Sequence, residues 1–373
     1  MRTGDEDVGR LRSELDTVDR ALIEAAARRQ QIVAEIGRVK HARGQPLRDF
    51  QREAEVLAHV RERAGQTGLD PALAERLMRE LIEASLTAQE QDRVRLSNHG
   101  EGQTALIIGG NGRMGRWFAR FLLGQGFHVT IADPGGAPGN LEHVQDWTLA
   151  IDRADLVVVA TPLRASAAIL GQMVTLAPPG LVIDIASLKS PLIEPLINLA
   201  DRGVAVCSTH PMFGPDARLL SGRQVLLMPV ADNRQALARA EALFKATEAH
   251  LIELTLDEHD RRIAWILGLS HAINLLFADT LTRSGLSLDK LGPLASTTFA
   301  RQLAITADVS RENPHLYFEI QHLNTCQHEV LSAMETAASG LREIVKSGDE
   351  AAFVELMQRS ADWLQVPKSD CIE

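Results

Sequence analysis

The stretch ALIIGGNGRMGRW, residues 105–117, decides how this chain folds, because a short apolar run leads directly into a glycine-rich turn and then into a helix-forming segment. Glycines at this spacing hold the pyrophosphate of a dinucleotide against a helix N-terminus. Gly110 allows the tight turn, Gly112 lets the backbone approach the phosphates, and Gly115 lets the helix pack closely on the strand. Because similar turns also occur without a ligand, the surrounding sequence has to decide between the two interpretations.

That surrounding sequence favours a dinucleotide, since a second apolar run follows the helix and ends at Asp133. A carboxylate at this place accepts a hydrogen bond from a ribose 2′-hydroxyl and repels a 2′-phosphate, which favours NAD over NADP. Arg113 and Arg116 nearby weaken that preference. The predicted cofactor-binding residues are Gly110, Gly112, Arg113, Met114, Gly115 and Asp133.

Further apolar runs rich in Val and Ile follow, separated by helical segments or longer connections. The runs cover residues 105–108, 129–132, 156–160, 181–185, 204–208 and 225–230. This alternation predicts a doubly wound parallel sheet of the Rossmann type. From about residue 258 the helical period returns and lasts almost to the end. We therefore expect an NAD-binding Rossmann domain over residues 103–231 and an all-helical domain over residues 232–373.

Residues 1–98 show helical periodicity only, and residues 98–102 have the composition of a linker. Within residues 11–40, apolar side chains recur alternately every four and three residues, as in the seam of a helix pair. The seam consists of Leu11, Leu15, Val18, Leu22, Ala25, Arg29, Ile32, Ile36 and Val39. Two more helices are expected over residues 49–63 and 71–95, the latter opened by Asp70 and Pro71. This pattern predicts a three-helix, all-α module.

Arg29 is a cation on an otherwise apolar seam, a costly position unless an anion meets it. Lys40 lies eleven residues further along, on nearly the same face of the helix. Ser85 and Gln89 continue the inward stripe of the third helix. Buried polar groups need partners, so this convergence favours a pocket for an anionic ligand. An internal Arg–Glu pair, or an arginine that extends out to water, is the structural alternative.

Composition narrows the class of protein. The net charge is -10 over 373 residues, which leaves no basic face for nucleic acid. Cys207, Cys326 and Cys371 lack metal-ligand spacing, so we expect reduced thiols and no metal site. The acidic N-terminus is no signal peptide, and no apolar run is long enough to span a membrane. These features predict a cytoplasmic protein with small-molecule ligands.

The polar positions of the first module resemble those of the all-helical chorismate mutases, across residues 11–95. The matching positions are Leu11-Arg12, Arg28-Arg29, Val39-Lys40, Arg48-Asp49, Arg52-Glu53, Glu83, Ser85 and Gln89. The resemblance implies that two arginines, Arg12 and Arg29, bind the carboxylates of chorismate, and that Lys40 and Gln89 donate to its ether oxygen. It further implies that Glu53 accepts from the ring hydroxyl, that Ser85 supports a carboxylate, and that Asp49 and Arg52 complete the pocket.

Helix geometry adds a constraint on Arg12 and Arg29. Seventeen residues along one straight helix separate them by roughly 25 Å, and they face about 100° apart. One small diacid cannot touch both within a single chain. If both serve one site, Arg12 comes from a second chain, as in the intertwined dimers of the all-helical mutases.

A second resemblance covers roughly residues 103–365. The segment STHPMFGPD, residues 208–216, follows a predicted strand, where open sheets place their ligands. With residues 184–189, 258–260 and 270–271 it resembles the prephenate dehydrogenases. This implies that His210, with Ser187 beside it, accepts the proton of the substrate hydroxyl, while Arg301 binds the ring carboxylate and His271 contacts substrate. Taken alone, His210 fits a core histidine equally well, and Arg301 fits an ion pair. Many relatives carry a second histidine where this chain has Asn274.

The whole chain therefore resembles the bifunctional chorismate mutase/prephenate dehydrogenases, the T-proteins of tyrosine biosynthesis. This implies two substrates, chorismate and prephenate, with NAD as cofactor, 4-hydroxyphenylpyruvate as product, a homodimer, and tyrosine as a candidate feedback inhibitor. Three alternatives stay open: a pair of activities on 4-amino-4-deoxychorismate products, a dehydrogenase with a vestigial regulatory mutase, and a non-enzymatic NAD sensor. The sequence does not decide between prephenate and arogenate.

Overall fold

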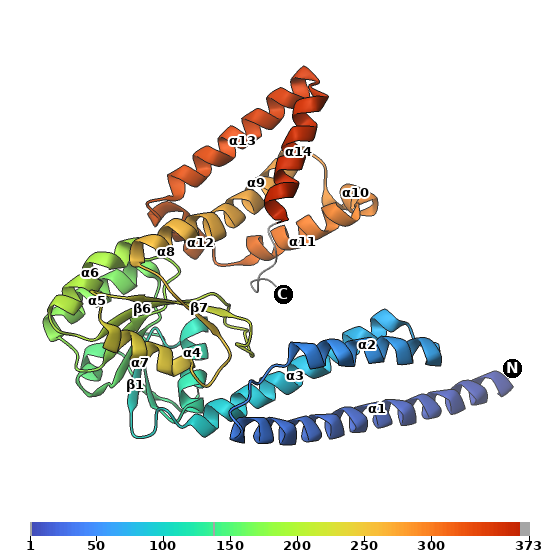
Figure 1. The fold of residues 1–373 in the computed structure, drawn as a ribbon, viewed down its shortest axis with the longest axis horizontal. Coiled ribbons are helices and arrows are strands. Elements are labelled where there is room, and N and C mark those ends of the chain that lie inside the picture. Colours follow the sequence, from blue (N-terminus) through green and yellow to red (C-terminus); the bar gives the residue numbers. More distant parts are fainter. Residues whose placement is uncertain (1, 137–138, 366–373) are drawn as a thin grey trace.

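The computed structural model describes residues 2–136 and 139–365 and divides into three regions in chain order (Figure 1). Long helices form the N-terminal region, a sheet with helices on both faces follows, and a second group of helices ends the chain. Both helical groups project from the region of the sheet. The expected sequence of an all-α module, a Rossmann-type sheet and a helical region is confirmed.

Three helices form the N-terminal region: α1 (Arg2–Ala42), α2 (Phe50–Thr67) and α3 (Pro71–Ser97). Asp70 caps α3 through the backbone N–H of Ala72, with Pro71 in the first turn, as the sequence predicts. Gly68 and Asn98 end α2 and α3 in the left-handed conformation. All three expected helices are present, and α1 and α2 are longer than predicted.

The helix α1 packs on α3 through a face that includes Arg29 but not the apolar residues of the predicted seam. Arg29, Gln30, Val33, Gly37 and Lys40 are half-buried, and several of them contact α3. The apolar seam residues lie on the neighbouring face, where Leu11 is 54% exposed and Leu22 61% exposed. Within one chain, α3 therefore does not cover the apolar residues of the seam. A stripe of this kind has to be covered by another surface.

Eight strands form one sheet in the order β3-β2-β1-β4-β5-β6-β7-β8. They are β1 (Thr104–Ile108), β2 (His128–Ala132), β3 (Glu142–Val144), β4 (Leu156–Val159), β5 (Leu181–Asp184), β6 (Val206–Pro211), β7 (Gln224–Pro229) and β8 (His250–Glu253). The first six have the strand order of a dinucleotide-binding sheet. Every neighbouring pair is parallel except β6 and β7, which are antiparallel.

Helices cover both faces of the sheet because successive side chains of each buried strand point to opposite sides. In β1, Ala105 and Ile107 pack with α4 (Arg113–Gly124) and α7 (Arg234–Phe244), whereas Leu106 and Ile108 pack with α5 (Leu163–Leu176) and α6 (Ile193–Asp201). Short 3₁₀ turns cover Trp147–Leu149, Ile151–Arg153, Ser190–Leu192 and Gly292–Leu294.

Several sequence predictions for this region need correction. The sheet does not end at residue 231, because α7 and β8 complete it up to Glu253. The strands β3 and β8 were not predicted, since they are short, lie at the two edges and carry polar, partly exposed residues. The strand β6 extends beyond residue 208 to Pro211, so His210 lies within the strand rather than after it.

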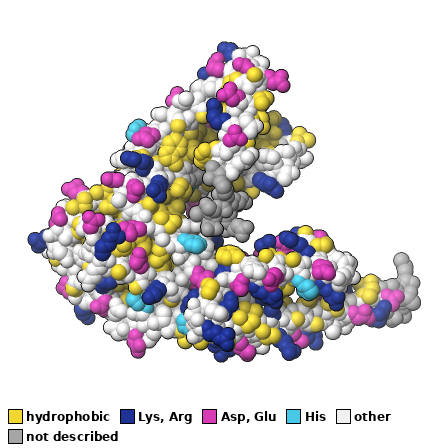
Figure 2. All heavy atoms as spheres, viewed as in Figure 1, with side chains coloured by type: hydrophobic (Ala, Val, Ile, Leu, Met, Phe, Trp, Pro, Cys, Tyr) yellow, Lys and Arg dark blue, Asp and Glu magenta, His cyan; other side chains and the backbone are white. Residues whose placement is uncertain are grey.

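The C-terminal helices are α8 (Leu256–Ile263), α9 (Leu269–Arg283), α10 (Leu288–Leu291), α11 (Thr297–Arg311), α12 (Pro314–Leu323), α13 (Gln327–Ser347) and α14 (Glu350–Leu364). A π-helical segment, Ala264–Gly268, joins α8 to α9. Hydrophobic side chains gather over α9 and α13 on the visible face (Figure 2). Large apolar residues such as Leu276 and Leu331 are about half exposed there, so this surface also requires a partner.

By length and composition, residues Leu256–Arg283 could cross a membrane, with a mean hydropathy of 1.3 over their most apolar window. The same stretch buries His259, Asp260, His271 and Asn274. Buried polar side chains at four positions are typical of a helix that packs inside a protein and contributes to a site.

Candidate active sites

The glycine turn lies between β1 and α4 and is built as the fingerprint requires. A Cβ at Gly115 would come within 2.3 Å of the carbonyl oxygen of Gly109, so only glycine lets α4 approach the strand this closely. A Cβ at Gly110 would meet the side chain of Ile131 at 2.5 Å. The positive φ of the turn, 80°, belongs to Gly109, which directly precedes the predicted glycines. Gly112 caps α4 without a side-chain hydrogen bond, which leaves the first backbone N–H groups available for phosphate.

Asp133 follows β2 and faces this turn. Its carboxylate accepts hydrogen bonds from the backbone N–H of Asn111 at 3.1 Å and of Gly135 at 2.8 Å. Arg113 pairs with Asp216 and Glu312, and Arg116 donates to the carbonyl oxygen of Asn111. Both arginines therefore already have partners in the protein. The residues present fit a dinucleotide with a free ribose 2′-hydroxyl.

A polar cluster lies between α1 and α3. The guanidinium of Arg29 donates to the hydroxyl of Ser85 at 2.8 Å and to the carbonyl oxygen of Leu81 at 3.0 Å. Among the side chains that the structure describes, no carboxylate pairs with Arg29, and burial lowers its pKa. Gln89, on the next turn of α3, donates to the carbonyl oxygen of Val33 at 2.6 Å. The predicted convergence of Arg29, Ser85 and Gln89 is thus present.

Two residues of this cluster were missed by the sequence interpretation. Gln30 accepts a hydrogen bond from Ser85 and donates to the carbonyl oxygen of Leu81. Gly37 faces the side chain of Gln89, and a Cβ there would lie 2.8 Å from it. The spacing of residues 30, 33, 37 and 40 could have revealed both residues, because positions three and four apart share one face of a helix.

The remaining predicted mutase residues do not contact Arg29, Ser85 or Gln89 in the hydrogen bonds and ion pairs of the described residues. Lys40 donates to the carbonyl oxygen of Leu47 at 3.3 Å. Glu53 pairs with Arg48 at 3.0 Å, whereas Arg52 is exposed and pairs with Glu55. Asp49 caps α2 by accepting from the backbone N–H of Arg52. Arg12 is exposed on α1, which runs unbroken through Arg29, as the distance argument assumes.

A second polar group is buried at the carboxyl end of the sheet. His210 on β6 is 4% exposed, and its Nδ1 lies 2.8 Å from Nε2 of His259 on α8. Nδ1 of His259 lies 2.7 Å from the carboxylate of Asp260. Burial lowers the pKa of His210 well below its ordinary value, and the neighbouring His259 and Lys189 lower it further. His210 is therefore neutral at ordinary pH and is a candidate proton acceptor.

A buried ion pair and its hydrogen bonds hold the strand ends around His210. The ammonium of Lys189 donates to Asp184 at 2.6 Å and to the carbonyl oxygen of Thr209 at 2.7 Å. The second carboxylate oxygen of Asp184 accepts from Ser208 at 2.5 Å. Ser187 is half-buried on the same connection, but the side-chain hydrogen bond described for His210 goes to His259. The sequence interpretation did not identify His259 as a partner.

The helix α9 contributes His271, whose ring stacks on Tyr317 with centroids 3.9 Å apart. Its Nδ1 is buried and has no hydrogen-bond partner within the described residues. Asn274 accepts from Gln302 and Thr306 of α11, so it joins two helices. Arg301 is exposed on α11, and no described contact joins it to His210 or His271.

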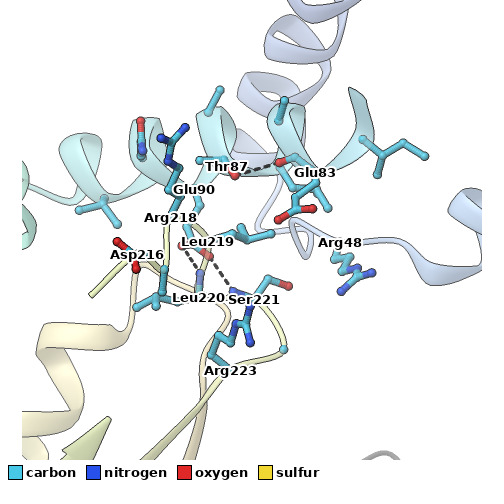
Figure 3. A pocket seen from close by; sticks show the side chains of 18 of the residues that line it. Arg48, Glu83, Thr87, Glu90, Asp216, Arg218, Leu219, Leu220, Ser221 and Arg223 are labelled. Atoms are coloured by element: carbon cyan, nitrogen blue, oxygen red, sulfur yellow. Dashed lines mark hydrogen bonds between the residues drawn. The ribbon is translucent and has the colours of Figure 1, made fainter. Parts of the chain in front are cut away.

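A cavity of about 1310 Å³ lies between α3 and the loop that follows β6. It includes Glu53 but neither Arg29 nor His210. Here the buried carboxylate of Glu90 on α3 accepts from the backbone N–H groups of Leu220 and Ser221, at 2.7 and 3.0 Å (Figure 3). These bonds join the loop carried by the His210 strand to the helix that carries Gln89.

Across residues 2–136 and 139–365, no cluster of three or more His, Cys, Asp or Glu side chains is arranged to hold a metal ion.

Three family models match the chain in the expected order. The model of type II chorismate mutase matches residues 11–90, and that of the prephenate dehydrogenase nucleotide-binding domain matches residues 140–253. The model of the prephenate dehydrogenase dimerization domain matches residues 255–359. The second match begins after Asp133, so the glycine turn lies outside it, and the turn joins that domain through the pairing of β1 with β2 and β4.

Similar proteins agree with this order. A T-protein of Enterobacter agglomerans is 29% identical over 358 residues, 95% of this chain and 92% of that protein. A 4-amino-4-deoxyprephenate dehydrogenase of Streptomyces pristinaespiralis is 28% identical over 263 residues, 67% of this chain and 88% of that protein. The crystal structure of prephenate dehydrogenase from A. aeolicus in complex with hydroxyphenyl propionate and NAD+ has a TM-score of 0.58, at 18% identity over 71% of this chain and 98% of that chain.

The three matches succeed one another without overlap along a single polypeptide, and the T-protein similarity runs through all of them. This chain belongs to the bifunctional chorismate mutase/prephenate dehydrogenases.

Proposed function

We propose that the N-terminal helices rearrange chorismate to prephenate and that the rest of the chain oxidises prephenate with NAD. The observation that carries this proposal is the presence, in one chain, of a guanidinium without a described carboxylate partner and a neutral histidine near the carboxyl end of the sheet that also carries the dinucleotide turn. The first side chain binds an anion and the second accepts a proton. The product of one reaction is the substrate of the other.

The mutase reaction needs no proton transfer, because the rearrangement is pericyclic. The catalyst has to hold the folded dianion and stabilise charge that develops on the breaking ether oxygen. In our proposal Arg29 and Ser85 bind a carboxylate, Lys40 and Gln89 donate to the ether oxygen, and Glu53 accepts from the ring hydroxyl. In the free chain Gln89 donates to Val33 and Lys40 to Leu47, so chorismate takes over these donors.

Arg12 completes this pocket from a second chain. The 41 residues of α1 form one helix, so the arginine at position 12 cannot reach the chorismate that Arg29 holds. The exposed seam of α1 and the match to a dimerization domain both support a homodimer. Asp49 caps α2, and in our proposal Arg52 and Glu53 of that helix complete the same pocket.

In the dehydrogenase, His210 accepts the proton of the C4 hydroxyl of prephenate while a hydride leaves C4, which forms a carbonyl. The C1 carboxylate then departs as CO₂, its bonding electrons aromatise the ring, and the phenolate oxygen takes back the proton from His210. NAD, when bound, supplies the hydride acceptor. The glycine turn would hold its pyrophosphate, and Asp133 would accept a hydrogen bond from its ribose hydroxyl.

Two residues are assigned to the carboxylates of prephenate. The unpartnered Nδ1 of His271 supports a role in binding substrate. Arg301 is assigned to the ring carboxylate, with Ser187 close to His210. Because Arg301 lies on α11, which packs on the helix of His271, this assignment places both on one side of the substrate.

The experiment that tests the function supplies the full-length protein with chorismate, with and without NAD, and identifies the products. We expect prephenate without NAD, and 4-hydroxyphenylpyruvate with CO₂ and NADH when NAD is present. Parallel assays with arogenate and 4-amino-4-deoxyprephenate define the substrate. Release of neither product would refute the proposal. Titration with tyrosine tests feedback inhibition, and cell fractionation tests our assignment of the enzyme to the cytoplasm.

A further inference from the structure

We propose that His259 and Asp260 are positioning residues that hold His210 in a single tautomer, with a hydrogen on Nδ1 and a bare Nε2 directed to the substrate. This rests on the proposed dehydrogenase function only for its catalytic consequence, because the tautomer itself is a property of the free protein. The inference follows from three side chains joined by two hydrogen bonds.

Asp260 fixes the direction of the chain of hydrogen bonds because its carboxylate only accepts. It receives hydrogen bonds from the backbone N–H of Lys189 at 2.8 Å, and from the backbone N–H and the hydroxyl of Ser190. Burial alone raises the pKa of Asp260, but the bonds from His259 and Ser190 outweigh it and the pKa falls. Asp260 is therefore ionised, and Nδ1 of His259 must be the donor in their contact.

The hydrogen bond between His259 and His210 has the same donor-to-acceptor direction. Burial lowers the pKa of His259 in spite of its bond to Asp260, so that ring is neutral and carries its hydrogen on Nδ1. Its Nε2 is then an acceptor, and Nδ1 of His210, 2.8 Å away, has to donate. A neutral imidazole with its hydrogen on Nδ1 leaves Nε2 as a lone pair. That lone pair is the base that the oxidation of the substrate hydroxyl requires.

The surroundings leave no competing proton donor for this pair of rings. His259 is fully buried and Asp260 is 3% exposed, so water does not interrupt the chain. Apart from the three residues themselves, the charged groups nearby are Lys189 and Asp184. Lys189 donates to Asp184 and to the carbonyl oxygen of Thr209, and no hydrogen bond from its ammonium to either histidine is present among the described residues.

The backbone also fixes the position of His259. Thr255 and Glu258 form a reciprocal capping box at the start of α8, which locks the first turn of the helix. The π-helical segment that follows, Ala264–Gly268, joins α8 to α9 without a break, so His259 and His271 lie on one continuous helix. The wider π turn changes the direction in which the later side chains of this helix point. Single π-helical turns within α-helices are frequent near functional side chains.

The tautomer can be measured directly in protein labelled with ¹⁵N-histidine, at a pH of about 8 where neutral imidazoles dominate. We expect the His210 resonances, identified by their loss in His210→Asn, to show a protonated Nδ1 and a bare Nε2. A His210 with its hydrogen on Nε2, or an even mixture of tautomers, would overturn the proposal. This result needs no activity and no variant of His259.

Two substitutions at His259 test the catalytic consequence. His259→Leu removes the acceptor, and we expect a fall in dehydrogenase kcat of about 10- to 100-fold with a small change in KM. His259→Gln places an amide oxygen near the former Nε2, so it should restore the His210 tautomer and most of the lost turnover. The control is His250→Leu, the same change at an exposed residue at the start of β8, which should leave kcat unchanged.

These outcomes separate the two proposals. A wild-type His210 with the expected tautomer but no turnover of prephenate would refute the proposed function and leave the tautomer established. Wild-type turnover in a folded His259→Leu protein would refute the positioning role while leaving the function intact. If His259→Leu does not fold, the wild-type spectrum and the His259→Gln variant decide the question.

Discussion

Arg29 is half-buried and His210 is buried, and the partners of the two side chains also differ. The contacts of Arg29 are neutral, a hydroxyl and a carbonyl oxygen, and it lies beside a seam of α1 that one chain leaves exposed. His210 is joined through His259 to an ionised carboxylate within the same chain. The mutase pocket thus keeps a positive charge available and is completed by a second chain. The dehydrogenase pocket keeps a lone pair available and fixes its position through hydrogen bonds within a single chain.

The difference follows the chemistry that each pocket has to perform. A pericyclic rearrangement of a dianion needs fixed positive charge, and that charge can come from two subunits. Proton acceptance needs one defined nitrogen, and a tautomer is fixed only by short, directional hydrogen bonds. The following predictions test this comparison.

Replacing His210 should have the largest effect and should be confined to the dehydrogenase. His210→Asn keeps a polar group but removes the base, so kcat should fall ~10²–10⁴-fold with little change in KM for prephenate. Mutase turnover, measured on the same preparation, should be unchanged. In the wild-type enzyme, the acidic limb of kcat/KM should lie below the ordinary histidine pKa of about 6.5, because burial, His259 and Lys189 all lower the pKa of His210. A limb at or above that value would contradict the buried, neutral base.

The reciprocal change is Arg29→Ala, which should abolish most mutase activity. Loss of a charge-assisted contact to a carboxylate in a dry pocket costs ~30- to 1000-fold in rate. The matched control is Arg28→Ala, since Arg28 is an exposed neighbour on the same helix. Dehydrogenase kcat and KM should match the wild type in both variants. Near-normal chorismate turnover in Arg29→Ala would remove Arg29 from the site.

Mixed subunits test whether the mutase site is built from two chains. After random exchange of Arg12→Ala and Arg29→Ala chains, half of the dimers are mixed, and each mixed dimer holds one site with both arginines. About a quarter of wild-type mutase activity should therefore return. Exchange has to be verified independently with differently tagged chains. No recovery after verified exchange would show that Arg12 does not act from the partner.

Gly37→Ala should have the smallest effect. The added methyl group would meet the side chain of Gln89 at 2.8 Å, so the amide has to move away from α1. A displaced donor should lower mutase kcat by roughly 10-fold, while leaving the dehydrogenase unchanged. Gly65→Ala is a suitable control, because a Cβ there meets nothing within 4 Å. If Gly37→Ala kept full mutase activity, close contact between Gln89 and α1 would be irrelevant to catalysis.

Many elements of this fold can be predicted from short stretches of the sequence. The glycine spacing of residues 110–115 specifies the turn before α4, and the Val- and Ile-rich runs specify the central strands, because short-range sterics and side-chain alternation act within a few residues. The helical period of residues 11–40 likewise predicts α1 and its apolar seam. Arg29 stood out because a cation on an apolar stripe is unusual in any fold.

Other features were settled only by tertiary packing. The face of α1 that meets α3 is not the apolar seam, because the seam is left exposed for a different surface. The edge strand β8 carries too few apolar residues to be recognised, and it forms because β7 offers it a hydrogen-bonding partner. His259 lies 49 residues from His210 in sequence. The sequence alone determined which side chains could do chemistry, whereas the tertiary structure decided which of them touch, because hydrogen bonds depend on distance and direction in space.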